Sequence, residues 1–313
     1  MKSSRPSAPL AERVLGGDTA SASRALSLIV DEAPEADALS KAFFARSGSV
    51  QKLGVCGPPG AGKSTLTARL VKHYRARGLK VGVLAVDPSS PISGGAFLGD
   101  RLRIQEHALD EGVFIRSLAS RGKIGGLSHT IFGAIHVLEA WGCRRLIIET
   151  VGTGQDEVEI ARVADTVLYV TTPSMGDEIQ AMKAGVMEVG DVFVVNKADL
   201  AGKDKAISDL KTALGLGAAH EPKPWHTPVV GTSGLTGEGV AELAAAAEAH
   251  WAYLKDSGEG KRRLKEQHRE EISLYVSRRV YQTALSRLGD KDLDALLAHK
   301  TDPATVGAKL LKK

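Results

Sequence analysis

The sequence predicts a doubly wound α/β domain on a mostly parallel, buried sheet, with helical segments before and after it. Two observations predict this fold. Between residues 50 and 239, short apolar runs rich in β-branched residues alternate with amphipathic segments, a pattern typical of parallel sheets that helices cover on both faces. Outside these limits, apolar residues recur at helical spacing. With 313 residues and 43% hydrophobic content, the chain can bury a full core.

The first 49 residues predict a helical arm. Apolar residues recur at helical spacing over residues 9–46, with breaks near 16–18 and 33–34, so two or three short helices are expected. In the central domain, residues 50–239, strands are expected at 52–56, 80–86, 113–119, 144–149, 166–172, 192–196 and 227–231. Helices between the earlier strands are expected at 63–77, 100–111 and 127–141.

Residues 240–313 predict a C-terminal helical region. One face of segment 240–254 is apolar and is formed by Val240, Leu243, Ala244, Ala247, Trp251 and Leu254. In segment 270–288 the apolar residues form two stripes, Ile272, Val276 and Val280 on one and Leu274, Tyr281, Leu285 and Leu288 on the other. One stripe can pack on the α/β domain and leave the other for a partner. A small self-contained helical bundle explains the pattern equally well.

Composition and charge argue against several classes of protein. The net charge of +4 is small for this length, so nucleic-acid binding is not expected. Cys56 and Cys143 lie far apart and form no CxxC pair, which is typical of a reduced cytosolic protein without disulfides or a zinc site. The N-terminus lacks the apolar segment of a secretory signal, and no run approaches the roughly 18 apolar residues of a membrane span. We therefore expect a cytoplasmic protein that binds no membrane.

The segment KLGVCGPPGAGKSTL (52–66) reads as a strand, a glycine-rich loop and the start of a helix. It satisfies the pattern GxxxxGK[ST], in which loop amides and the helix N-terminus bind phosphate oxygens. Lys63 supplies a cation to the β- and γ-phosphates, and the Ser64 hydroxyl can ligate Mg²⁺. A glycine-rich turn before a helix is the plainer alternative. The predicted nucleotide-binding residues are Gly57, Pro58, Pro59, Gly60, Ala61, Gly62, Lys63, Ser64 and Thr65.

The run DVFVVNKADL (191–200) places an NKxD motif at the end of an apolar strand. The Asp199 carboxylate can accept from both the ring N–H and the exocyclic amine of guanine, an arrangement that adenine does not offer. Asn196 can bond the other edge of the base while the Lys197 stem covers the ring. The backbone of TSGLTGEG (232–239) would reach the guanine carbonyl through Ser233, Gly234 and Leu235. Without the phosphate loop, these polar residues would read as an ordinary turn.

Two further segments carry acidic residues after strands. DPSSPISGGAFLGDR (87–101) begins 24 positions after Lys63, with Asp87 at the end of a strand and Asp100 beyond a flexible SGG sequence. These carboxylates are either turn residues or ligands that approach Mg²⁺ together when the loop closes. In RRLIIETVGTGQDE (144–157), Glu149 ends a strand and Gly152 completes an ExxG turn. The Gly152 amide can sense a γ-phosphate, and Glu149 can hold a water of the Mg²⁺ shell.

In order and spacing, five segments resemble the MeaB/ArgK family: GPPGAGKST, VDPSSPISGGAFLGDR, ETVGTGQDE, TPSMGDEIQAMKAG and NKAD. This family comprises G-protein chaperones of methylmalonyl-CoA mutase and related adenosylcobalamin-dependent acyl-CoA mutases, and its human relative is the methylmalonic aciduria type A protein. The resemblance covers nearly the whole chain. It implies a P-loop NTPase G domain of the SIMIBI class, which nickel-insertion and signal-recognition GTPases share.

The resemblance also implies cofactors, partners and roles. GTP or GDP and Mg²⁺ would be the cofactors, and the family's members are usually homodimers through C-terminal helices. They bind a mutase, gate the transfer of adenosylcobalamin from an adenosyltransferase, and protect the enzyme. The catalytic residues would be Lys63, Asp87, Asp100 and Glu149, with Ser64 as a further metal ligand. Asp177, Gln180 and Lys183 would form the switch that relays contact with the mutase.

The expected activity is GTP hydrolysis that is slow in the free protein. No glutamine stands directly after Gly152, where Thr153 is found, so we expect the mutase to accelerate turnover by organising the switches. Two other functions stay open. A small-molecule kinase would use ATP and would not need a guanine-reading carboxylate. A nickel-insertion GTPase would need a Cys/His cluster, which Cys56 and Cys143 do not form.

Overall fold

The computed structural model describes residues 9–87, 110–119, 130–150, 159–175, 188–218 and 224–311, with only the backbone at Asp87, Ala119, Met175 and residues 216–218. The chain divides into two compact units, residues 1–264 and 265–313. Within the described ranges, every helix is too short or too polar to cross a lipid bilayer.

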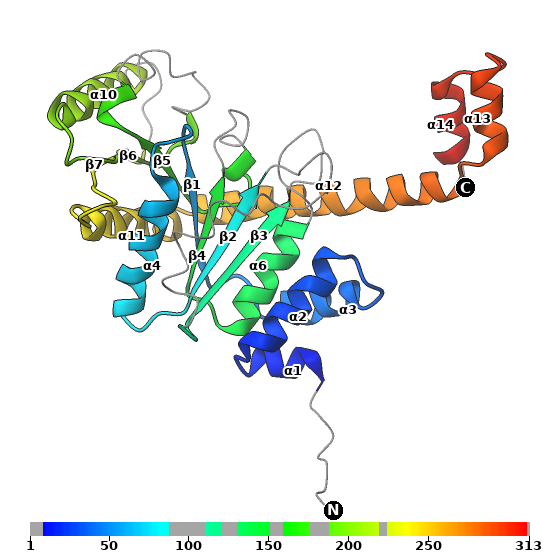
Figure 1. Ribbon diagram of the computed structural model, residues 1–313, viewed down its shortest axis with the longest axis horizontal. Coiled ribbons are helices and arrows are strands. Elements are labelled where there is room, and N and C mark those ends of the chain that lie inside the picture. The colour runs from blue at the N-terminus through cyan, green and yellow to red at the C-terminus, as the bar shows by residue number, and fades with distance from the viewer. Residues whose placement is uncertain are drawn as a thin grey trace, which may run out of the picture. The chain divides into compact units, whose positions relative to one another are not determined.

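The first unit is built on a seven-stranded sheet of the order β3-β2-β4-β1-β5-β6-β7 (Figure 1). The strands are β1 (Gln51–Cys56), β2 (Val81–Asp87), β3 (Val113–Ala119), β4 (Arg145–Thr150), β5 (Thr166–Thr171), β6 (Val192–Val195) and β7 (Val229–Gly231). All neighbours pair in parallel. Every expected strand is thereby confirmed to within two residues at each end. Because the strands are parallel, their carboxyl ends lie at one edge, where open α/β sheets bind ligands beside the strand at which the order reverses.

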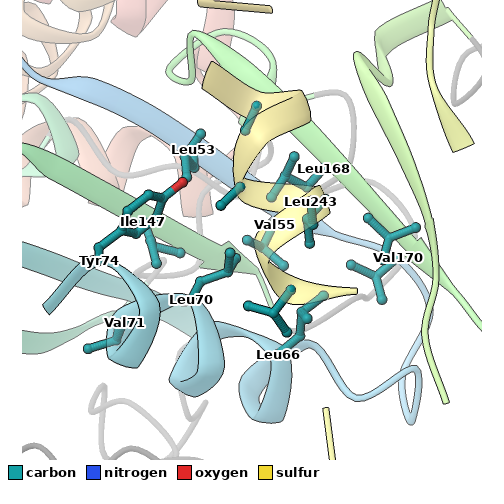
Figure 2. Close-up of a cluster of buried hydrophobic side chains, with 14 of the residues drawn as sticks. Leu53, Val55, Leu66, Leu70, Val71, Tyr74, Ile147, Leu168, Val170 and Leu243 are labelled. Atoms are coloured by element: carbon teal, nitrogen blue, oxygen red, sulfur yellow. The ribbon is translucent and has the colours of Figure 1, made fainter. Parts of the chain in front are cut away.

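Helices α4 (Lys63–Ala76) and α11 (Val240–Asp256) cover one face of the sheet. Figure 2 shows the α4 side chains packing against the strands and against Leu243 of α11. On α4 the packed residues recur at helical spacing and are Leu66, Leu70, Val71 and Tyr74. The apolar face predicted for 240–254 therefore packs on the sheet, and the first compact unit continues past residue 239 to residue 264. The domain limits at 49/50 and 239/240 stay predictions.

On the opposite face, α6 (Thr130–Trp141) lies between the sheet and a three-helix arm (Figure 1). The arm consists of α1 (Leu10–Leu15), α2 (Thr19–Val30) and α3 (Ala36–Phe44), in agreement with the predicted short helices. Nearly every α6 side chain is buried because the helix is covered on both sides. At Gly133 a Cβ would stand 2.6 Å from Cγ2 of Ile29, so only glycine lets α2 approach this closely.

Helix α10 (Lys203–Ala218) packs against β6 and β7; the sequence did not predict this helix. Helix α12 (Glu259–Arg287) starts in the first unit, and its residues from 265 belong to the second, with α13 (Asp290–Leu297) and α14 (Pro303–Leu311). Within the second unit, Lys309 Nζ lies 2.6 Å from Asp292 Oδ1, and Arg287 donates to the Leu310 carbonyl at 3.0 Å. Both apolar stripes predicted for segment 270–288, which lies mostly on α12, carry exposed side chains, among them Ile272, Val276, Val280, Tyr281 and Leu285.

Candidate nucleotide-binding site

The loop between β1 and α4 owes its shape to glycine. Gly57, Gly60 and Gly62 have φ angles of 132°, 76° and 85°, in the region that L side chains rarely adopt. A Cβ on Gly57 would also stand only 2.1 Å from the Val170 carbonyl oxygen of β5. The strand and helix that the sequence predicts on either side of this loop are both present. The backbone is therefore arranged as a phosphate-binding loop that leads into a helix N-terminus.

Lys63, the first residue of α4, lies in the curve of this loop. Its Nζ donates to the carbonyl oxygens of Gly57 at 2.8 Å and Pro58 at 2.9 Å, and the side chain is buried. The loop thus holds a cation inside its curve, beside amides that face phosphate oxygens in loops of this kind. This position suits the role predicted for Lys63, which is to meet the charge of the β- and γ-phosphates.

Ser64 and Glu149 meet beside the loop. The Ser64 hydroxyl donates to Glu149 Oε1 at 2.5 Å, and both side chains are buried. The sheet register brings them together, because Glu149 pairs with Val55 of β1 and with Ala85 of β2. Hydroxyl and carboxylate oxygens are hard donors of the kind that Mg²⁺ takes, so this pair fits the predicted metal site.

Of the other predicted metal-binding and switch residues, the structure describes only a part. The backbone of Asp87 ends β2, the neighbour of β4, at the same edge of the sheet. Asp100, Gly152, Asp177, Gln180 and Lys183 lie outside the described residues. In the part of the chain that the structure describes, no group of three or more His, Cys, Asp or Glu side chains could hold a metal. Cys56 and Cys143 are both buried thiols.

Asn196 joins the phosphate loop to the loop that follows β7. Its Nδ2 donates to the Ala61 carbonyl at 2.8 Å, and its Oδ1 accepts from the Gly234 amide at 3.0 Å and from the Thr232 hydroxyl at 3.2 Å. The side chain is 1% exposed. A Cβ on Gly62 would stand 2.5 Å from this Nδ2, so glycine is needed there for a second reason. In this structure Asn196 therefore holds two loops together. Its predicted contact with the base stays a prediction.

Asp199 points outward from the same turn. Ser233 Oγ donates to Asp199 Oδ1 at 2.6 Å, and this hydrogen bond, aided by the charge of Lys197, holds the pKa of the Asp199 carboxyl below its usual value. Lys197 has a φ of 58°, an uncommon conformation for a non-glycine residue. The turn at Lys197 separates the buried Asn196 from the exposed Asp199. An ionised, exposed carboxylate is what pairing with two N–H groups of a base requires.

The structure adds two residues that the sequence did not indicate. Arg69 of α4 donates to the carbonyl oxygens of Gly234 and Leu235, at 2.9 and 2.5 Å. Lys203, at the start of α10, pairs with Glu238 at 2.9 Å. Both contacts hold the loop after β7 against elements distant in sequence, and no local motif marks either residue. The Lys203 pair also connects the segment after Asp199 to this loop.

Comparison with known proteins identifies the family. The model of a family described as "Methylmalonyl Co-A mutase-associated GTPase MeaB" matches residues 22–288. A Pyrococcus horikoshii relative, whose name describes it provisionally as a GTPase, is 41% identical over 312 residues, 99% of this chain and 98% of the relative. GTPase ArgK of Escherichia coli is 41% identical over 191 residues, which cover 60% of this chain and 58% of ArgK.

Two further similarities extend over most of the chain. The methylmalonic aciduria type A homolog of Caenorhabditis elegans is 34% identical over 247 residues, 77% of this chain and 60% of that protein. A crystal structure described as an LAO/AO transport system kinase has a TM-score of 0.71 at 29% identity and covers 98% of both chains. The chain therefore belongs to the MeaB family of methylmalonyl-CoA mutase-associated GTPases, and its fold is that of a P-loop GTPase that binds guanine nucleotides.

Proposed function

We propose that this GTPase is a chaperone of an adenosylcobalamin-dependent acyl-CoA mutase, with methylmalonyl-CoA mutase as the first candidate. In this proposal, binding and hydrolysis of GTP gate the loading of the mutase's cofactor and protect the enzyme. The single observation that carries it is the match of residues 22–288 to a family described by its association with that mutase. The C. elegans relative, named for methylmalonic aciduria, supports the same partner.

The phosphate half of the site supports phosphoryl transfer, which depends on positioning and charge stabilisation more than on covalent chemistry. Lys63, fixed in the loop by two carbonyl oxygens, would neutralise charge on the transferred phosphoryl group. Ser64 and Glu149, with Asp87 and Asp100, would hold Mg²⁺, which would supply positive charge against the phosphates. The Gly152 amide would sense the γ-phosphate.

The base half supports selectivity for guanine. Asp199 is exposed and accepts from Ser233, so its ionised carboxylate can receive the two N–H groups of a guanine edge. The backbone from Ser233 to Leu235 would meet the guanine carbonyl. Asn196, which joins two loops, would also bond the other edge of the base, and the Lys197 stem would cover the ring. Adenine lacks the donor edge that Asp199 requires.

Partner contact would act through the segment that contains Asp177, Gln180 and Lys183. Free-protein hydrolysis is expected to be slow because Thr153 stands where other GTPases place a water-positioning glutamine. A cobalamin adenosyltransferase would be a second partner, as the source of adenosylcobalamin. The exposed apolar side chains of α12, including Ile272, Val276 and Tyr281, support a homodimer formed through this helix.

The test uses the full chain, titrated with GTP, GDP and ATP and then mixed with purified methylmalonyl-CoA mutase. We expect guanine nucleotides to bind at least a hundredfold more tightly than ATP and a complex with the mutase to elute as one species on size exclusion. ATP-dependent phosphorylation of a small molecule, without preference for guanine, would support the kinase alternative instead. Failure to bind any acyl-CoA mutase would remove the chaperone role but leave the GTPase intact.

A further inference from the structure

Arg69 lies at the boundary between the two halves of the nucleotide site. It stands on α4, the helix that starts at the phosphate loop, and it contacts the loop after β7 that is predicted to read the base. Its Nε donates to the Gly234 carbonyl at 2.9 Å, and its Nη2 donates to the Leu235 carbonyl at 2.5 Å. One planar guanidinium thus holds two successive carbonyl oxygens, a geometry that its rigid fork of donors permits.

Holding these carbonyls fixes the direction of the next two amides. In a trans peptide the C=O of one residue and the N–H of the following residue point to opposite sides of one rigid plane, and the described residues contain no cis peptide. Because the Gly234 oxygen faces Arg69 on α4, the Leu235 N–H must point away from that helix. This amide is one of those predicted to meet the guanine carbonyl.

The peptide between Leu235 and Thr236, which Arg69 also holds, is connected to the predicted base contact of Asp199. The Leu235 oxygen faces Arg69, and the Thr236 N–H of the same peptide donates to Ser233 Oγ at 3.2 Å. Ser233 Oγ in turn donates to Asp199, whose carboxylate is predicted to pair with the N–H edge of guanine. Arg69 is therefore connected to both predicted base contacts through a single short stretch of backbone.

The loop is also seated directly on α4. A Cβ on Gly234 would stand 3.1 Å from Cγ2 of Thr65, and the Gly234 amide is held by Asn196. Thr65 fixes where the loop lies and Asn196 fixes one amide, but neither determines the orientation of the 234–235 peptide. Among these described contacts, that orientation is set by Arg69.

We propose that Arg69 is a positioning residue for guanine recognition, which acts by aiming the Leu235 amide at the 6-oxo group of the base. The inference rests on guanine-nucleotide binding at this site. It also makes α4 a rigid link between the phosphate loop and the base loop. A lysine at this position could hold one carbonyl oxygen but not both with a planar fork.

The test compares GDP with ADP and with 6-thio-GDP, which keeps the N1–H and the 2-amino group and carries sulfur, a weaker hydrogen-bond acceptor, in place of the 6-oxo oxygen. Dissociation constants are measured for wild type, Arg69→Ala and Arg69→Lys in the full chain. Arg77→Ala is the matched control, because Arg77 follows the same helix and pairs with Glu248. Circular dichroism and the thermal midpoint show whether each variant is folded.

We expect Arg69→Ala to weaken GDP binding about tenfold, the order of one hydrogen bond to a charged group, with a smaller loss for 6-thio-GDP. Arg69→Lys should lose less, and Arg77→Ala should match wild type. Equal weakening of GDP and 6-thio-GDP, or no weakening, in folded Arg69 variants would overturn the inference while leaving base recognition intact. A wild type that binds ADP as tightly as GDP would overturn base recognition itself, and the inference with it.

Discussion

The two edges of the sheet carry the same kinds of polar residues, but these residues have different roles. At the carboxyl edge, Asn196 and Ser233 connect one loop to another, Arg69 connects α4 to the loop after β7, and Asp199 stays exposed. At the amino edge, Asp191 is buried and accepts from the Val167 amide at 2.9 Å. At the carboxyl edge a hydrogen-bond acceptor stays accessible to a ligand, whereas at the amino edge the Asp191 carboxylate is bonded within the protein.

The partners of Asp191 come from the C-terminal helices. Arg263, at the start of α12, donates to both Asp191 oxygens, at 2.8 and 2.7 Å. His250 of α11 has 0% exposure, and its Nδ1 lies 2.9 Å from the hydroxyl of Thr166. These contacts anchor α11 and the first residues of α12 to the starts of β5 and β6. A cluster whose charged groups pair within the protein in this way serves attachment and not binding.

His250 shows how strongly burial acts at this edge. Its Nε2 lies 3.3 Å from Asp191 Oδ1, yet burial lowers the pKa of His250 to about 4, because desolvation outweighs the attraction of Asp191. The imidazole is therefore neutral at pH 7, so the contact is not an ion pair. The contrast with Asp199 is direct: its exposed carboxylate is held in the charged form by one hydroxyl.

The largest expected effect separates activity from stability at the carboxyl edge. Lys63→Ala should reduce GTP turnover on the order of a thousandfold, because it removes the cation that offsets phosphate charge. The free energy of unfolding should change little. Lys72→Ala, at an exposed position of the same helix, is the matched control and should hydrolyse GTP like wild type. Equal activity in the two variants would contradict the role given to Lys63.

The opposite pattern is expected at the amino edge. Asp191→Ala leaves the Arg263 guanidinium without its carboxylate and should cost about 3–5 kcal/mol of unfolding free energy. The nucleotide dissociation constant of the folded fraction should stay the same. Urea denaturation with and without GDP measures both quantities. The control is Glu238→Gln, which breaks an exposed pair with Lys203 and should cost less than about 1 kcal/mol.

Protonation of His250 gives a third test. A neutral His250 contributes stability that is fully present above its unfolded pKa of about 6.5. Because the folded pKa is lower, at about 4, that contribution is lost as the pH falls from 6.5 towards 4, by about 2–3 kcal/mol in all. Unfolding free energies between pH 7 and pH 4.5 should fall more steeply for wild type than for His250→Asn. Parallel curves would show that His250 does not sense this range.

The smallest effect sharpens the comparison within the base loop. Ser233→Ala removes the hydroxyl that bonds Asp199 and should weaken GDP binding by about three- to tenfold. The pKa of Asp199 should rise towards its usual value, because that hydrogen bond is the main cause of its depression. Isothermal titration at pH 7 measures the first effect. Thr212→Ala, at an exposed position of α10, should bind GDP like wild type.

The sequence predicted the features that depend on residues close together in the chain. β-Branched runs marked every strand, and fixed spacings marked the phosphate loop and the NKxD turn, because each depends on neighbours within a few residues. Helix α10 was missed because its Ala- and Lys-rich segment shows little amphipathic contrast. The apolar face of 240–254 was found, but a stripe of this kind fits a partner as well as a sheet, and only the structure shows that it packs on β5 and β6.

Contacts between distant residues could not be predicted in this way. Arg69 meets its two carbonyls across 165 and 166 positions, and Arg263 meets Asp191 across 72. No periodicity links such residues, and a single arginine on a helix is usually a solvated surface residue. Asn196 illustrates a subtler limit: its motif predicts a contact with the base but does not reveal that its amide also joins two loops.

The most direct test of the central claim is GTP turnover by the full chain, measured alone and with increasing methylmalonyl-CoA mutase. The account predicts turnover well below one per second for the free protein and a rise of at least tenfold with the mutase, both absent in Lys63→Ala. Lys72→Ala should respond like wild type. Turnover of several per second without any partner, or a rate that no acyl-CoA mutase changes, would contradict it.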